Sequence, residues 1–273
     1  MPNLRAVKIA TLLSLLASPA WAADAGDRAQ ALIDKGHAYL RAQQKPDGGW
    51  QASDKEPVAV TAIALRTFVQ DAKYDSKTDF VAKGFEKLIG YQTQDGGIYK
   101  DLLAGYNTAI AVSTLAAAND PAMKPQLDKA VEYLKRLQWT EETKPEFADD
   151  KEGNTGRQVV KDAGDPFYGG WGYGGRSRGA GRPDLSNTQL AIEALKDAGL
   201  PPDDPTMKRA IEFVARCQNN SETNTTSTWA GNDGGFIYGP SDDRGGESFA
   251  GKSTDASGLT RFKSMGTMSF AGL

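Results

Sequence analysis

The chain has 273 residues, of which 32 are Lys or Arg and 35 are Asp or Glu, so its formal net charge is −3 at pH 7. A charge this close to balance argues against a nucleic-acid partner, which would need a strongly basic surface. Because Cys217 is the single cysteine, no internal disulfide can form, and stability has to come from a sizeable apolar core.

The N-terminus has the layout of a secretory signal peptide. Arg5 and Lys8 carry the early positive charge, Ile9 to Ala17 is an apolar run, and Ala20 to Ala22 resembles a small-x-small cleavage site. The apolar run is too short to span a bilayer, and we identify no transmembrane segment in the rest of the chain. We therefore expect residues 1–22 to be a cleaved signal peptide and the mature chain to be exported to the periplasm or the extracellular space. A short membrane anchor or a disordered start is the alternative.

Four segments of the chain align with one another and have the same helical pattern. Each begins with a basic residue, ends nine positions later in glutamine, and carries its apolar residues on one helical face. This pattern predicts amphipathic helices with one face in water. The segments are KGHAYLRAQQ from Lys35, KGFEKLIGYQ from Lys83, KAVEYLKRLQ from Lys129 and RAIEFVARCQ from Arg209.

A second, more apolar set of segments alternates with the first. Two of its members are apolar nearly all round, which predicts burial on every side. We expect two concentric layers, with the amphipathic helices outside and the apolar helices inside. A threonine recurs at one register position of the apolar set. The segments are PVAVTAIALRTFV from Pro57, YNTAIAVSTLAAA from Tyr106, LSNTQLAIEAL from Leu185 and GTMSFAGL from Gly266, and the threonines are Thr61, Thr108, Thr188 and Thr267.

A short motif of Gln, Asp-Gly-Gly and an aromatic residue follows the outer segments. It reads QQKPDGGW from Gln43 and QTQDGGIY from Gln92, with a variant, NDGGFIYG, from Asn232. Asp-Gly-Gly supplies a turn with positive φ, and the Asp can accept backbone N–H groups. The Gln amide, which is both donor and acceptor, can link one repeat to the next. We interpret the motif as structural, with Trp50, Tyr99 and Phe236 filling the seams between helices; catalytic aspartates are the alternative.

This motif, repeated in register with helical hairpins, resembles the prenyltransferase/squalene oxidase repeats of squalene–hopene cyclases, oxidosqualene cyclases and protein prenyltransferase β subunits. The resemblance covers Arg28 to Leu273. It implies that residues 23–273 form an all-α domain, an α/α toroid of helical hairpins around an apolar cavity. Four hairpins are visible, with long insertions near residues 139–183 and 219–264, and the fourth is cut short. We expect a C-terminally truncated copy; an open toroid or one closed by a partner are the alternatives.

The resemblance also points to one candidate catalytic residue. Squalene–hopene cyclases protonate their substrate with an Asp-x-Asp-Asp-Thr motif before an inner helix, where this chain reads DLSNT. Asp184 and Thr188 match, but Ser186 and Asn187 replace the two later aspartates, so Asp184 lacks the paired carboxylate that shifts a pKa. Asp184 is therefore our catalytic candidate, with capping of the following helix by Asp184 and Ser186 as the alternative. Whether the chain is an enzyme stays open.

No metal or cofactor is expected. Protein prenyltransferases bind zinc through Asp, Cys and His, but His37 and Cys217 are the only residues of their types and both lie on apolar helical stripes. We take both as core residues.

We expect an exported protein that binds an isoprenoid-like or other apolar ligand, a small molecule or a lipid, in a central cavity. Two alternatives stay open: a non-catalytic scaffold that binds a protein partner or an envelope polymer, and a carbohydrate-active toroid, which would need spaced carboxylates. The candidate ligand contacts are Tyr106, Asn107, Trp171, Tyr173 and Asn187.

Overall fold

The structure is a computed structural model that separates into two units, residues 1–43 and 44–273. The first unit contributes one helix, α1 (Pro19–Gln43). The predicted signal peptide, residues 1–22, lies outside the described residues except for its last four, which form the start of α1. Among the described helices, none combines the length and the apolar character that crossing a membrane requires. The described residues are 19–53, 55–143, 160, 162–174, 182–225, 227–240 and 248–273.

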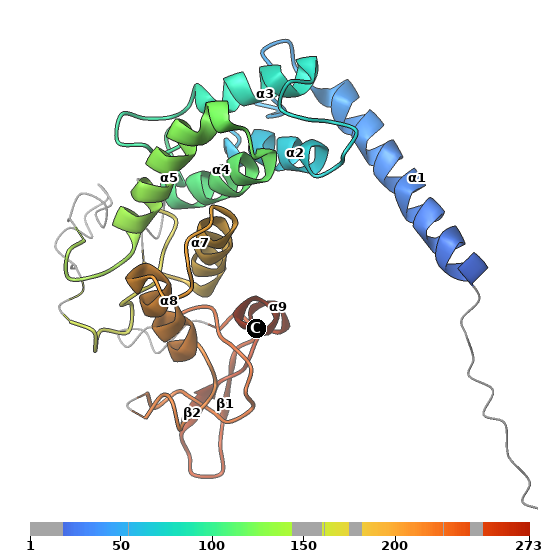
Figure 1. The fold of residues 1–273 in the computed structure, drawn as a ribbon. Helices are drawn as coiled ribbons and strands as arrows, with labels where there is room; N and C mark the ends of the chain where they lie inside the picture. The colour runs from blue at the N-terminus through green and yellow to red at the C-terminus, as the bar shows by residue number, and fades with distance from the viewer. Residues whose placement is uncertain are drawn as a thin grey trace, which may run out of the picture. The chain divides into compact units, whose positions relative to one another are not determined.

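The helices of the second unit pack in two layers (Figure 1). In the inner layer α2 packs against α4, α4 against α7 and α7 against α9; in the outer layer α3, α5 and α8 pack against α2, α4 and α7 respectively. The predicted alternation of outer and inner helices is confirmed in this unit. The inner helices are α2 (Ala59–Val69), α4 (Ala104–Ala118), α7 (Leu185–Asp197) and α9 (Gly266–Gly272). The outer elements are α3 (Asp79–Ile89), α5 (Lys124–Leu137) with the 3-10 turn η1 (Pro121–Met123) before it, and α8 (Pro205–Arg216).

The difference between the layers follows from the side chains of each helix. The inner helix α4 is mostly Ala, Val, Ile and small hydroxyl residues, and 11 of its 15 residues are buried. Small side chains let it approach its neighbours closely, and Thr114 donates a hydrogen bond to the carbonyl of Ala62 on α2 at 3.0 Å. The outer helix α8 instead buries one stripe that includes Met207, Ala210 and Phe213, while Ile211 on the other face is exposed.

The predicted glutamine link between repeats is confirmed. In each of the first three turns one Gln Nε2 donates two hydrogen bonds, one to a glycine carbonyl of its own turn and one to a carbonyl in the first turn of the next outer helix. The acceptors and distances are Gly48 (2.9 Å) and Phe80 (2.7 Å) for Gln44, Gly96 (3.1 Å) and Gln126 (2.9 Å) for Gln92, and Gly169 (2.9 Å) and Thr206 (2.8 Å) for Gln138.

The recurring hydroxyl of the inner helices accepts the backbone N–H of the residue that follows each Gly-Gly pair. In the first three repeats the pairs are Trp50 with Thr61 (3.0 Å), Ile98 with Thr108 (2.9 Å) and Trp171 with Thr188 (3.0 Å). In the fourth, Phe236 donates to Ser269 at 3.0 Å, so the prediction of Thr267 was wrong by two residues. The position needs a hydroxyl facing the turn, and Ser269 supplies it. The seam residue of the second turn is likewise the buried Ile98, whereas Tyr99 stacks on Tyr133 at 6.0 Å.

The second long insertion contains secondary structure that the sequence pattern did not predict. Strand β1 (Lys252–Thr254) pairs antiparallel with β2 (Thr260–Phe262); apart from this small sheet the described secondary structure is helical, which is consistent with the predicted all-α class. Phe262 packs with Trp229, Ala230 and Ile237 in a small apolar cluster.

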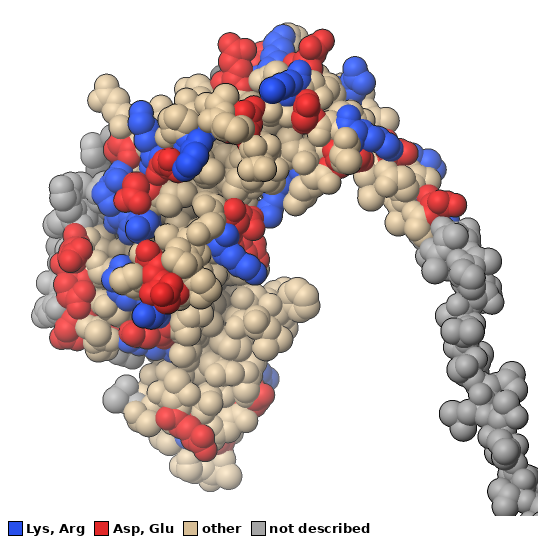
Figure 2. Space-filling view, viewed as in Figure 1, with Lys and Arg blue, Asp and Glu red and all other residues tan. Residues whose placement is uncertain are grey.

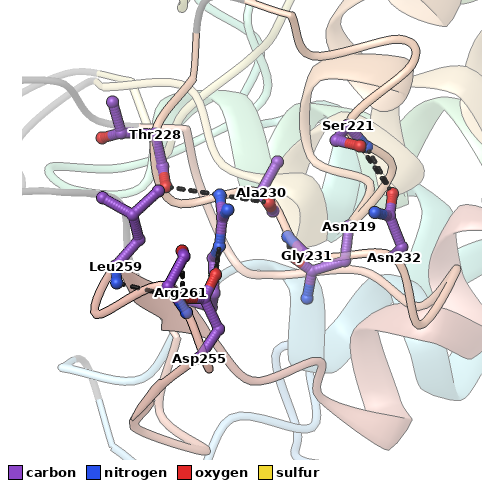
Figure 3. Close-up of polar contacts among 10 residues, drawn as sticks. Asn219, Ser221, Thr228, Ala230, Gly231, Asn232, Asp255, Leu259 and Arg261 are labelled. Carbon is purple, nitrogen blue, oxygen red and sulfur yellow. Dashed lines mark hydrogen bonds and ion pairs between the residues drawn. The ribbon is translucent and has the colours of Figure 1, made fainter.

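Two polar side chains fix the described parts of this insertion (Figure 3). The Arg261 guanidinium donates to the carbonyls of Thr228 and Ala230, both at 2.8 Å, and to the carboxylate of Asp255 at 2.7 Å. Asn219 accepts the Gly231 N–H at 3.1 Å and donates to the carbonyl of Phe262 at 2.9 Å. Most of the contacts that these two side chains make are therefore with main-chain groups, which any sequence supplies.

Candidate functional site

The N-terminal ends of the inner helices α4 and α7 carry the candidate site. Asp184 is the N-cap of α7: one carboxylate oxygen accepts the backbone N–H of Asn187 at 2.8 Å, and the other accepts the Asn187 side-chain amide at 2.7 Å. The helix begins at Leu185, so the capping alternative is confirmed for Asp184 and wrong for Ser186. Asp184 and Asn187, the catalytic candidate and one ligand candidate, thus lie in direct contact.

Tyr238 joins this pair and was missed by the sequence analysis. Its hydroxyl hydrogen-bonds with Asp184 and with Tyr173. The repeat contains the signal that could have found it, because Tyr238 stands two residues after Phe236 as Tyr173 stands two residues after Trp171.

The main-chain hydrogen bonds of Tyr173 and Tyr238 are equivalent as well. The Tyr173 carbonyl accepts the N–H of Gly105 at the start of α4 at 2.7 Å, and the Tyr238 carbonyl accepts the N–H of Leu185 at the start of α7 at 2.8 Å. Both tyrosines are therefore fixed by main-chain bonds to the start of an inner helix.

The electrostatics of the site are dominated by burial. Asp184 is 5% exposed, and burial raises the pKa of its carboxyl to about 6, although hydrogen bonds from Asn187 and Tyr238 partly oppose the rise. Burial, together with the Asp184 charge, also raises the pKa of the Tyr238 phenol. At neutral pH the site therefore holds one buried carboxylate next to a neutral phenol.

Asn187 has one hydrogen-bonding atom left over. Its Oδ1 is buried and has no partner among the described groups, and its orientation is fixed because the amide NH₂ must face Asp184. Asn107 holds the equivalent position in α4, but its Oδ1 accepts the Ala59 N–H of α2 at 2.8 Å and its amide donates to the Leu102 carbonyl at 2.9 Å. A buried acceptor without a donor costs about 1–3 kcal/mol, so Asn187 is suited to receive a donor from outside the chain.

The other predicted ligand contacts divide into two groups. Tyr106 and Tyr173 are partly exposed and their rings lie 6.4 Å apart, so they can offer aromatic surface next to the Asp184 pair. Trp171 is buried, and its indole N–H donates to the Leu134 carbonyl at 2.8 Å, so it fills the seam between helices. Asn107, with both amide atoms bonded as described, links two helices.

Comparison with known proteins adds no family: no protein-family model matches the chain, and no curated protein matches it. The site is therefore interpreted from its own geometry.

Metal ligands are not brought together in the described part of the chain, where no three His, Cys, Asp or Glu side chains are placed to hold an ion. Cys217 is fully buried with Leu185, Phe213 and Phe236, and burial raises the pKa of its thiol well above the ordinary value. His37 is buried in α1. Burial places both among the core residues.

A cleft of about 240 Å³ lies away from this site, between α5 and α8. Its polar walls are already bonded to one another: Arg209 donates to Gln138 Oε1 at 2.9 Å, and Gln138 donates to the Thr206 carbonyl at 2.8 Å. Lys135 lies 3.9 Å from Asp204. The cleft is therefore part of the third junction between repeats, and the Asp184 site is the better candidate for a ligand.

Proposed function

We propose that the chain is an exported repeat protein of the squalene-cyclase and prenyltransferase type, a toroid that binds an apolar ligand carrying a hydrogen-bond-donating head group. The observation that carries the proposal is the buried, unpartnered Oδ1 of Asn187, which lies beside the Asp184 carboxylate. A ligand hydroxyl or amine would supply the missing donor. An anionic head group is disfavoured, because it would meet the buried charge of Asp184.

The apolar part of the ligand would contact Tyr106 and Tyr173. Phenol rings offer a large apolar face with a polar edge, which suits an unsaturated hydrocarbon chain bearing a hydroxyl. An isoprenoid alcohol has this chemistry.

The proposal is binding rather than turnover. Both carboxylate oxygens of Asp184 are occupied by the Asn187 N–H groups, and Tyr238 adds a third hydrogen bond. Asp184 therefore acts as a positioning residue that orients Asn187.

The test uses farnesol, with farnesene as the matched hydrocarbon without a hydroxyl. The exported chain is titrated with each and followed by calorimetry. We expect saturable binding of farnesol, and we expect Asn187→Leu to weaken it roughly three- to tenfold while leaving farnesene unchanged. If neither compound binds saturably, or if the substitution weakens both equally, the proposal is wrong.

A scaffold that binds a protein or an envelope polymer is the second candidate. It is favoured by the dense packing of α4, whose residues are mostly buried by protein and so do not face an open cavity. A carbohydrate-active function has less support, because Asp184 is the single carboxylate among the buried side chains of the described residues, and glycosidases need a pair. Native mass spectrometry of the exported chain separates the two leading candidates, since the first requires a co-purifying apolar molecule.

A further inference from the structure

The junctions between repeats share a close approach of main chain to main chain. In each of the first three turns a glycine has positive φ, and a Cβ added to it would overlap with the carbonyl oxygen of the basic residue that opens the next outer segment. Each junction therefore consists of a glycine turn whose backbone directly contacts the backbone of the next outer helix. The pairs are Gly48 (φ 91°) with Lys83, Gly96 (φ 99°) with Lys129, and Gly169 (φ 84°) with Arg209.

The fourth turn is built in the same way. Gln218 Nε2 donates to the Gly234 carbonyl at 3.0 Å, and Gly234 has a φ of 74°. The Asn219 N–H donates to the Gly235 carbonyl at 2.7 Å, as the Lys45 N–H donates to Gly49 in the first turn at 2.9 Å.

No helix of the described part of the chain is seated on this fourth turn. No described atom comes within 4 Å of the point that a Gly234 Cβ would occupy, and Gly234 is exposed. Phe270 of the neighbouring α9 and Leu273, which follows this helix, are exposed as well. In Figure 2 the surface over α9 carries no Lys, Arg, Asp or Glu. Within the turn only Asp233 is charged, as Asp47 and Asp95 are in the first two turns, so the turn and α9 together offer a mainly uncharged face for one more outer helix.

Helix α1 carries the matching face. When Lys35 is aligned with Lys83, Lys129 and Arg209, its residues Ile33, Gly36 and Tyr39 fall on positions that the outer helices of the second unit use for packing. In α1, however, Ile33 is 47% and Tyr39 is 65% exposed. At the position of Ile33 the buried equivalents are Val81 and Met207. At the position of Gly36 they are Gly84, Ala130 and Ala210, and at the position of Tyr39 they are Tyr133 and Phe213.

We propose that α1 of one copy docks on the fourth turn of a second copy, in the manner of α3, α5 and α8 on the first three turns. By the register above, the Lys35 carbonyl would lie over Gly234 of the other copy. The carbonyl of Leu32, the equivalent of Phe80, Gln126 and Thr206, would accept the second hydrogen bond of Gln218. The contact continues an interface that the chain already forms three times, which is why a second copy is the expected occupant. It is heterologous, so copies associate head to tail.

The test is the oligomeric state of the exported chain, measured by sedimentation over a wide range of protein concentrations. We expect concentration-dependent association. Gly234→Val should weaken it at least about tenfold, because its side chain occupies the place of the Lys35 carbonyl. Ile33→Glu should do the same from the other side. Ile211→Glu is the matched control, because Ile211 is 60% exposed on the outer face of α8 and should leave association unchanged.

A mixing experiment distinguishes head-to-tail association from a symmetric dimer. A chain with Gly234→Val keeps an intact α1, and a chain with Ile33→Glu keeps an intact fourth turn, so an equimolar mixture should form heterodimers although each variant alone is monomeric. A wild-type chain that stays monomeric throughout would overturn the proposal. So would a monomer that Gly234→Val destabilises much more than Gly199→Val does, because both glycines have positive φ and the excess would show that a segment of the same chain occupies the turn. Association that neither variant weakens, or a mixture that forms no heterodimer, would also overturn it.

Discussion

Asp184 accepts both the backbone N–H and the side-chain amide of Asn187, at 2.8 and 2.7 Å, so one carboxylate closes the start of α7 and fixes the direction of the Asn187 amide. The capping role and the proposed ligand role are therefore coupled. A change at Asp184 acts on the helix directly and on the ligand through Asn187.

Replacing Asp184 with alanine should remove the cap of α7. We expect Asp184→Ala to lower the free energy of unfolding by about 1–2 kcal/mol, measured by urea denaturation at about pH 4. At this pH the carboxyl is protonated in the folded chain, so its burial as a charge does not offset the loss of the cap. The exposed Asp101 is the matched control, and Asp101→Ala should change stability by less than about 0.5 kcal/mol. Equal effects of the two substitutions would contradict the capping role.

The pH dependence of stability should report the burial of Asp184. Burial raises the pKa of this carboxyl from 3.8 to about 6 in the folded chain, so the folded state binds the proton more tightly than the unfolded state. The resulting stability is fully present below pH 3.8 and is lost as the pH rises through about 6, with a magnitude of about 3 kcal/mol. The Asn187-facing group of the Asp184→Asn variant cannot titrate. As the pH rises from 3.8 to about 6, the unfolding free energy of the variant should therefore increase relative to that of the wild type. Parallel pH profiles would show that the carboxyl is not shifted.

The repeat provides a matched pair of glutamines. Gln138 is buried and makes three side-chain hydrogen bonds, whereas the more exposed Gln218 has one side-chain bond among the described residues, to Gly234. We expect Gln138→Leu to cost roughly 2–4 kcal/mol because it leaves buried carbonyls unpaired, and Gln218→Leu to cost less than about 1 kcal/mol. Urea denaturation at low protein concentration measures both. A smaller loss for Gln138→Leu than for Gln218→Leu would contradict the linking role.

Substitutions at two glycines allow the cost of steric overlap to be measured apart from the cost of backbone strain. Gly96 and Gly199 both have positive φ, 99° and 89°, but a Cβ at Gly96 would overlap with the Lys129 carbonyl whereas a Cβ at Gly199 meets no described atom within 4 Å. We expect Gly199→Ala to cost about 1 kcal/mol from the left-handed backbone alone. Gly96→Ala should cost more than about 3 kcal/mol, because the helix must also move away. If thermal or urea unfolding shows the same loss of stability for both variants, the Gly96 turn and the Lys129 carbonyl are not in close contact.

The sequence predicted those features that depend on repeated local chemistry. The glutamine links and the two layers follow from residue types that recur at a fixed spacing, and Asp184 stands where a helix cap is expected. Tyr238 was missed because Phe236 was the only residue of its turn considered as a contact between helices, and because the equivalent Tyr173 lies in a turn, Gly-Gly-Trp-Gly-Tyr, that lacks the Asp of the motif.

Other features could not be read from the pattern. The choice between Thr267 and Ser269 depends on where α9 meets its turn, and a helix of 7 residues has too few apolar positions to fix that register. Strands β1 and β2 have three residues each, and their mostly exposed side chains show no alternation. They are fixed by Arg261 binding to main-chain carbonyls, a tertiary contact that local sequence does not encode.

The glycine turns also bear on how such an array can change over evolutionary time. Because the peptide backbone of one repeat touches the peptide backbone of the next, the pitch of the array is set by atoms that every amino acid shares. Substitutions on the outer helices can then accumulate without altering that pitch, provided that the turn keeps its glycine. Two proteins could thus preserve the same step from repeat to repeat while their sequences drift beyond mutual recognition.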